Sequence, residues 1–163
     1  RRLLENVRKA TLDTGVRSVW QDHMMVGLTL TDEASWTAVR SRVEQCFGVA
    51  KFFKAYKVPA DLDGVKEALP SLMEGRKFES FCIRANRADK RFPTTSEEIN
   101  RDLGAFVKDF SGARVDLTNP ELRISLEVLP AGIYVYFDEV RGHGGLPTFL
   151  MKSDTTEDHS FIT

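Results

Sequence analysis

The residues best suited to chemistry lie in one short basic stretch near the middle of the chain. Four cations fall within eight residues there: Arg84, Arg87, Lys90 and Arg91. Guanidinium groups bind phosphate oxygens two at a time, and a lysine ammonium adds a compact positive charge. The ring of Phe92, which follows directly, can stack on an unpaired base. The stretch therefore predicts a local site for a phosphate-bearing ligand.

The residues after this stretch predict a helix that supports the same site. Thr95 and Ser96 are good N-caps, and acidic residues follow in the first turn, as the positive end of a helix dipole favours. Backbone N–H groups at this end can bind an anion. Asn100 and Arg101 lie one turn further along, and Gly104 leaves room for close approach of another backbone or for tight packing on a sheet.

The alternative interpretation is a solvated charged face, in which Asp89 offsets part of the positive charge. Other chemistry has less support. Cys46 and Cys82 sit within apolar patterns and lack a Cys-x-x-Cys spacing, which predicts buried reduced thiols rather than a nucleophile or a redox pair. The histidines at 23, 143 and 159 are dispersed, so no metal site is predicted. The glycines at 142–145 precede Leu146-Pro147 instead of a helix, which does not fit a phosphate loop.

Composition limits the class of protein. The 163 residues include 42% apolar and 29% charged side chains, which is typical of a soluble globular protein of one domain or two small ones. The net charge is only −1, so any polyanion must be bound locally. No apolar run is long enough to span a bilayer, and the start of the chain does not resemble a secretory signal. A cytoplasmic protein with no membrane partner is therefore expected.

Residues 1–58 predict a first domain. A helix is expected from the start of the chain to Gly15, followed by strands at 16–20 and 24–30. A second helix is expected from Thr31 to Gly48, with Trp36 and Phe47 on its core face, and a further strand at 49–58. This order is that of a ferredoxin-like βαββαβ unit without its first strand. An open slot in the sheet would follow, and the residues after Leu146 are a less favoured candidate to fill it.

Residues 60–141 predict a second domain. Helices are expected from Leu62 and from Ser96, each ended by a glycine, and strands at 77–85, 115–117, 123–128 and 133–139. Residues 142–163 are expected to form a linker and a tail. The predicted fold class is therefore α+β, with two small mixed sheets covered by helices.

Three segments now resemble a known family, in the order that the family has them. They are NRADKRFPTTSEEINRDLG at 86–104, VDLTNP at 115–120 and GHGGLP at 142–147. Together they resemble the THUMP domain of the tRNA 4-thiouridine synthase family, also called the thiamine-biosynthesis sulfurtransferases. Residues 1–58 are similar to the N-terminal ferredoxin-like domain that precedes THUMP in that family. His143 departs from the pattern, because proline is usual there.

The resemblance implies a tRNA-binding module. In the family, the two N-terminal domains hold the acceptor stem and the single-stranded CCA end, and present uridine 8 to a catalytic domain. Position by position, the resemblance assigns RNA contacts to the following residues: Lys77, Arg84, Arg87, Lys90, Arg91, Phe92, Asn100, Arg101 and Asn119.

The resemblance also implies that the chemistry lies outside this chain. The family's catalytic domain, which uses ATP, carries a Ser-Gly-Gly-x-Asp-Ser loop soon after the Gly-Gly-Leu-Pro segment, whereas residues 148–153 read TFLMKS. We therefore expect no cofactor and no catalytic residue in this chain. Other interpretations remain open: a THUMP-like protein-interaction module, or the RNA-binding part of another THUMP enzyme such as a methylase or deaminase. A homodimer and a separate catalytic partner also remain open.

Overall fold

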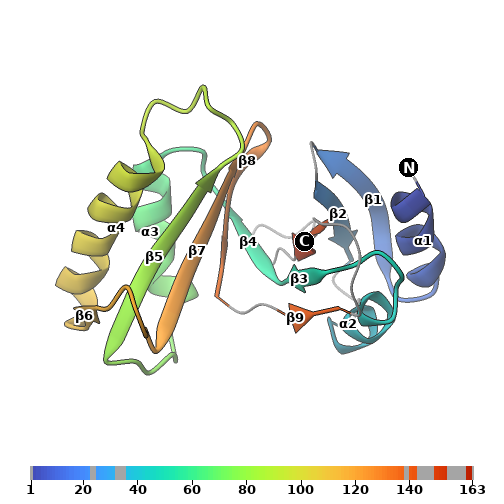
Figure 1. Cartoon of the computed structure of the whole chain (residues 1–163), viewed down its shortest axis with the longest axis horizontal. Coiled ribbons are helices and arrows are strands. Elements are labelled where there is room, and N and C mark those ends of the chain that lie inside the picture. Colours follow the sequence, from blue (N-terminus) through green and yellow to red (C-terminus); the bar gives the residue numbers. More distant parts are fainter. Residues whose placement is uncertain are drawn as a thin grey trace. The chain divides into compact units, whose positions relative to one another are not determined.

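The computed structural model describes residues 2–22, 25–31, 36–137, 140–142, 149–153 and 161–162 (Figure 1). The chain divides into two compact units, one formed by Arg1–Lys57 with Asp138–Thr163 and the other by Val58–Phe137. Each unit combines helices with a β-sheet, which confirms the predicted α+β class.

The first unit contains two helices and a mixed sheet. Its elements are α1 (Arg2–Ala10), β1 (Val16–Asp22), β2 (Met25–Leu30), α2 (Trp36–Glu44), β3 (Lys51–Phe53), β9 (Val140–Arg141), β10 (Phe149–Ser153) and β11 (Phe161–Ile162). The sheet order is β1-β2-β11-β3-β9, and β10 pairs with β2. Val7, Val39 and Val43 from the helices and Leu28 and Phe52 from the strands are fully buried and belong to one core. The expected helix-strand-strand-helix-strand order is therefore present.

The structure differs from the expected linker and tail at 142–163. Strand β10 pairs in parallel with β2, and β11 pairs antiparallel with both β2 and β3. Residues from the end of the chain thus pair where the ferredoxin-like order leaves its slot, because the edges of β2 and β3 present backbone groups that need hydrogen-bond partners. This was the less favoured alternative from the sequence.

Three further details of this part of the chain add to the expectations. Phe47 is 83% exposed, so its predicted place on the core face was wrong; α2 ends at Glu44, which breaks the helical spacing before residue 47. Gly27 leaves room for the side chain of Trp20, because an added Cβ would lie 2.1 Å from the Trp20 ring. The strand expected at 49–58 consists of two short strands, β3 and β4 (Ala55–Val58), that belong to different sheets.

The second unit places two helices on one side of a five-stranded sheet (Figure 1). The helices are α3 (Leu62–Leu72) and α4 (Ser96–Ser111); the strands are β4 (Ala55–Val58), β5 (Ser80–Arg87), β6 (Arg114–Val115), β7 (Leu122–Leu129) and β8 (Gly132–Tyr136). The sheet order is β4-β8-β7-β5-β6, with β5 parallel to β6 and β7 and with β7 antiparallel to β8.

The core of this unit follows from the side-chain alternation of its strands. Phe81 and Ile83 of β5 pair in register with Leu122 and Ile124 of β7, so they share one face of the sheet. Ile99, Leu103 and Val107 of α4 are buried at four-residue spacing, which gives the helix one apolar face. Because β5 and β7 run parallel, the loops after their carboxyl ends and the loops before their amino ends lie at opposite ends of the unit.

Candidate nucleic-acid interface

The basic loop, defined here as residues 88–95, leaves the carboxyl end of β5 and is fixed by backbone hydrogen bonds. The N–H groups of Ala88 and Asp89 both donate to the carbonyl oxygen of Val128, at 3.0 and 3.1 Å. The N–H of Phe92 donates to the carbonyl of Asp89 at 3.3 Å. The loop is therefore held to the end of β7 and turned back on itself before α4 begins, so its side chains project from a defined backbone.

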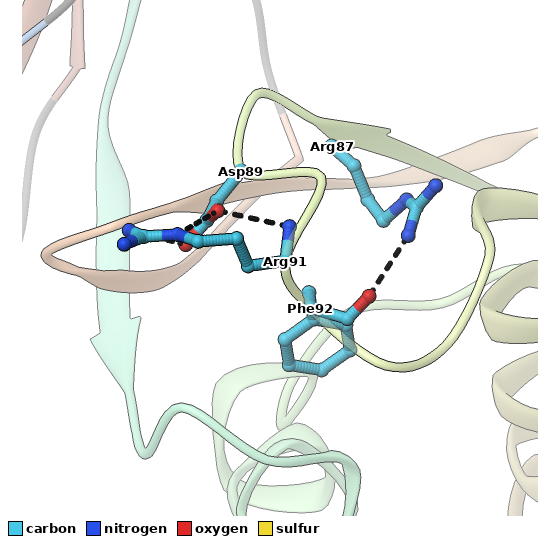
Figure 2. A network of polar contacts seen from close by, with 4 residues as sticks. All are labelled: Arg87, Asp89, Arg91 and Phe92. Carbon is cyan, nitrogen blue, oxygen red and sulfur yellow. Dashed lines mark hydrogen bonds and ion pairs between the residues drawn. The ribbon is translucent and has the colours of Figure 1, made fainter.

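Arg87 supports the loop from within. Its Nη1 donates to the carbonyl oxygen of Phe92 at 2.9 Å, which bridges the two ends of the turn (Figure 2). Its Nε atom is buried and has no hydrogen-bond partner among the described residues. The side chain is half-buried. Arg87 thus contributes to the shape of the loop as well as to its charge.

Arg91 is paired with Asp89 two residues earlier. Its Nε and Nη2 donate to the two carboxylate oxygens at 2.9 and 3.2 Å, and its backbone N–H donates to Oδ1 at 3.0 Å (Figure 2). The hydrogen bonds that Arg91 donates to Asp89, followed by the negative charge of Asp89, raise the pKa of the Arg91 guanidinium above its already high value. The Arg91 side chain is 80% exposed and that of Asp89 only 18%.

Three other cations present exposed positive charge at this end of the unit. Arg84, Lys90 and Arg101 are exposed, and none has a hydrogen-bond or ion-pair partner among the residues that the structure describes. Arg84 lies on β5 opposite Ser125 of β7, Lys90 on the basic loop and Arg101 on α4. Three different elements therefore bring positive charge to the carboxyl end of β5.

The amino end of α4 is capped by its own residues, Thr95 and Glu98. Glu98 N–H donates to Oγ1 of Thr95 at 3.2 Å, and Thr95 N–H donates to Oε2 of Glu98 at 2.8 Å. The Thr95 hydroxyl also donates to Oε2 of Glu98 at 2.8 Å. The bonds that the Thr95 backbone N–H and hydroxyl donate to the carboxylate lower the pKa of Glu98, and the charges of Arg101 and Arg87 contribute less. The capping box confirms the predicted helix start. It also supplies the negative charge that an external anion would have provided, which makes the helix end a poorer anion site than the sequence suggested.

Asn100 faces the sheet through its amide oxygen. Its Oδ1 accepts a hydrogen bond from the N–H of Ala85 at 2.8 Å, which ties α4 to β5. Asn100, one of the predicted RNA-binding residues, thus has a structural role in joining α4 to β5 that does not depend on RNA. Gly104 lies further along α4, and an added Cβ there would meet nothing within 4 Å, so packing does not require glycine.

Two predicted site residues lie at the other end of the unit. Lys77 precedes β5 and Asn119 precedes β7, and both are exposed. An eight-residue strand such as β5 spans roughly 25 Å, so these two residues are not brought together with the basic loop. Asn119 sits in a turn in which Asp116 Oδ1 accepts the N–H groups of Thr118 and Asn119 at 3.0 Å each.

The described residues also bear on the predictions for metal and thiol chemistry. No group of three or more His, Cys, Asp or Glu side chains that could hold a metal is present among them. Cys46 and Cys82 are buried as free thiols, and burial raises the pKa of Cys46. Within the same residues, none of the helices is long and apolar enough to cross a membrane. The three histidines and the end of the glycine-rich segment lie outside the described residues.

Sequence reasoning missed two carboxylates near the loop. Asp89 was seen only as a partial neutraliser of charge, although its spacing of two residues from Arg91 could have suggested a local pair. Glu127 of β7 is only 6% exposed and accepts a hydrogen bond from Nδ2 of Asn86 at 2.9 Å. Its burial had no signal in the sequence, because it alternates with core residues as an outward-facing position would.

Comparison with known proteins agrees with this architecture. Residues 59–138 match the THUMP domain family. A solved structure of PH1313 from Pyrococcus horikoshii Ot3 superposes with a TM-score of 0.76, covering 89% of this chain and 51% of that one at 24% identity. A crystal structure described as a 4-thiouridine synthetase–RNA complex with bound ATP superposes with a TM-score of 0.70, covering 93% of this chain and 47% of that one, also at 24% identity. At such identities the two superpositions establish the fold. The chain therefore belongs to the THUMP-domain proteins.

Among these proteins, the sequence relatives are more specific. The chain is 39% identical over 147 residues to a probable tRNA sulfurtransferase of Thermus thermophilus and 33% identical over 147 residues to that of Moorella thermoacetica. Both alignments cover 90% of this chain but only 36% and 37% of the relatives. Over nine tenths of its length the chain is thus similar to probable tRNA sulfurtransferases, and it spans little more than a third of the length of these relatives.

Proposed function

We propose that the chain is a tRNA-binding module that holds the acceptor stem and CCA end at the carboxyl end of β5. One observation carries the proposal: Arg84, Lys90 and Arg101 come from three different elements and present exposed positive charge beside a loop held by hydrogen bonds. Phosphate contacts of this kind supply much of the affinity of nucleic-acid binding. Phe92, half-buried on the loop, is the proposed platform for an unstacked base of the end.

The relatives support this assignment and suggest its context. They are named probable tRNA sulfurtransferases, and one structural neighbour is a 4-thiouridine synthetase in complex with RNA and ATP. In the longer protein, the module would present uridine 8 to a catalytic domain that uses ATP. The recognition would depend on RNA shape, phosphates and unpaired end bases, because side chains cannot read the deep major groove of an A-form helix. The cytoplasm is the proposed location.

The proposal is tested by the salt dependence of binding to an acceptor-stem minihelix that ends in CCA. We expect the double variant Arg84→Ala/Arg101→Ala to bind more weakly and to lower the slope of log K against log salt concentration by about 1.5, since each lost phosphate contact removes about 0.7 to 0.9. Fluorescence anisotropy with labelled minihelix, at several salt concentrations, measures both quantities.

A matched control removes two positive charges from the opposite end of the same unit. Lys108→Ala/Arg114→Ala changes the net charge equally, at exposed residues in the last turn of α4 and on β6 beside the amino end of β5, and we expect nearly unchanged binding. If the two double variants lose affinity equally, RNA is attracted by overall charge and not by the proposed surface. A wild-type chain without salt-dependent affinity for the minihelix would refute the proposal itself.

A further inference from the structure

We infer that Asp89 is a positioning residue of the RNA site, whose carboxylate orients the Arg91 guanidinium so that its Nη1–Nη2 edge binds a backbone phosphate. The inference rests on the proposed function, since the ligand is the phosphodiester of the bound RNA. Net charge alone would predict that the acidic Asp89 weakens RNA binding, whereas the inference predicts that Asp89 strengthens it.

The geometry of the pair leaves one edge of the guanidinium available. Asp89 accepts hydrogen bonds from Nε at 2.9 Å and from Nη2 at 3.2 Å, so both of its oxygens lie along the same edge of the planar guanidinium group. Both N–H groups of Nη1 and the second one of Nη2 have no partner among the described residues. These groups form the end-on fork that matches two oxygens of a phosphate.

Asp89 is itself anchored, which makes it a suitable support. Its N–H donates to Val128, its carbonyl accepts from Phe92, and its Oδ1 also accepts the backbone N–H of Arg91 at 3.0 Å. Its side chain is 18% exposed, whereas that of Arg91 is 80% exposed. A mostly covered, fixed acceptor thus holds a solvent-facing donor. Figure 2 shows the Arg91 guanidinium lying against Asp89 and extending away from Arg87.

Two effects of Asp89 on RNA binding oppose each other. Its charge repels phosphate, but this repulsion acts in a water-exposed setting where salt screens charges over about 8 Å. Its hydrogen bonds hold a long, flexible side chain in one orientation, so less side-chain entropy is lost when phosphate binds. We expect the second effect to be larger, because the pair is bidentate and Asp89 is tied to the backbone at three points.

The test compares variants of the full chain for minihelix affinity at physiological salt. Asp89→Asn removes the charge but keeps an oxygen for the backbone N–H of Arg91. We expect roughly fivefold weaker binding, because losing the fixed orientation of Arg91 should cost more than relieving the repulsion between Asp89 and phosphate gains. Glu97→Gln is the matched control, because it removes an exposed carboxylate with no partner among the described residues in the nearby first turn of α4. This control should bind as tightly as wild type or slightly tighter.

A double-mutant cycle separates positioning from a general structural role. If Asp89 acts through Arg91, then Asp89→Asn should weaken binding by no further factor in an Arg91→Ala background. A loss of loop structure would persist in that background and would overturn the inference. Arg91→Lys is a second variant that leaves Asp89 and the net charge unchanged; because lysine has no planar fork, binding should weaken about as much as in Asp89→Asn.

The outcomes are distinguishable from failure of the proposed function. If wild type binds the minihelix and Asp89→Asn binds equally or more tightly, Asp89 is a neutraliser and the inference is wrong while the function stands. Wild-type affinity of Arg91→Lys would likewise refute the fork. If wild type has no affinity, the proposed function fails and the inference fails with it.

Discussion

Replacing Asn100 with alanine should destabilise the second unit without depending on RNA. The Asn100 amide oxygen accepts the N–H of Ala85 at 2.8 Å, and this bond joins the second turn of α4 to β5. Both residues are half-buried. After the substitution, the N–H of Ala85 would point at a methyl group, with limited access for water to replace the lost acceptor.

The magnitude follows from the partner that is left behind. A typical intramolecular hydrogen bond contributes about 1 kcal/mol, and a buried donor left unsatisfied costs roughly 1 to 3 kcal/mol. We expect about 2 kcal/mol here because Ala85 is partly, not fully, screened from water. With a urea m-value of about 2 kcal/mol per molar, the midpoint of unfolding should fall by about 1 M.

Amide NMR of the full chain measures the effect where it arises. Urea titration is followed on the cross-peaks of residues 58–137, because both tryptophans lie in the first unit. Hydrogen exchange should show reduced protection of the Ala85 amide in particular. Asn119→Ala is the matched control, since that asparagine is exposed and its side chain has no hydrogen bond among the described residues; its effect should stay within about 0.5 kcal/mol.

A second substitution separates stability from binding. Asn100→Asp keeps an oxygen acceptor for Ala85, so the unfolding midpoint should stay near that of wild type, while the new negative charge should weaken minihelix binding. The reasoning would be refuted if Asn100→Ala left the midpoint and the Ala85 exchange rate unchanged, because the amide oxygen would then have no role in joining α4 to β5.

Three more predictions follow from α4 and its ends. Gly104→Ala should stabilise the second unit by about 1 kcal/mol, since alanine favours the helix and its Cβ meets no atom within 4 Å; weaker RNA binding by this stabilised variant would show that RNA approaches the helix there. Gly112→Ala should instead destabilise by about 1 kcal/mol, because φ is +72° at that C-cap, and chemical denaturation that ranks it above wild type would contradict this. The lowered pKa of Glu98 means that its stabilising contribution is present above its ordinary value near 4.5 and is lost as pH falls through the lower folded value. Thr95→Ala should reduce stability at neutral pH by about 1 kcal/mol and flatten this acid dependence, as melting temperatures between pH 7 and 3 would report; an unchanged pH profile would exclude the capping box as the cause.

Local signals accounted for α4 and its ends. Thr95 and Glu98 are three residues apart, and the capping box needs only that spacing and the residue types. Gly112 ends the helix with a left-handed conformation that glycine adopts readily. The interactions responsible lie within a few residues of each other along the chain, so the sequence contains them almost directly.

Strand boundaries and chain-end pairings were less predictable. The strand expected at 77–85 runs from Ser80 to Arg87, so Arg87, expected in the loop beyond the strand, lies on β5 together with Arg84. Its length depends on pairing with β7, about 40 residues later, where Arg87 lies opposite Val128. The strands β10 and β11 likewise depend on partners more than 100 residues away, and no short-range periodicity marks them.

The sequence by itself determined the α+β class, the two helices of the second unit, and the basic stretch with its capped helix, because these depend on residue type and short spacing. Only the tertiary structure decided what each cation can do. Lys77 and Asn119 are separated from the basic loop by the length of β5. Asn100 accepts a hydrogen bond from Ala85, and Arg87 donates one to the carbonyl of Phe92. The backbone N–H of Asp89 is bonded to Val128, and its carboxylate binds Arg91. Hydrogen bonds form according to distance in space, and that distance is set only when α4, β5 and β7 pack together.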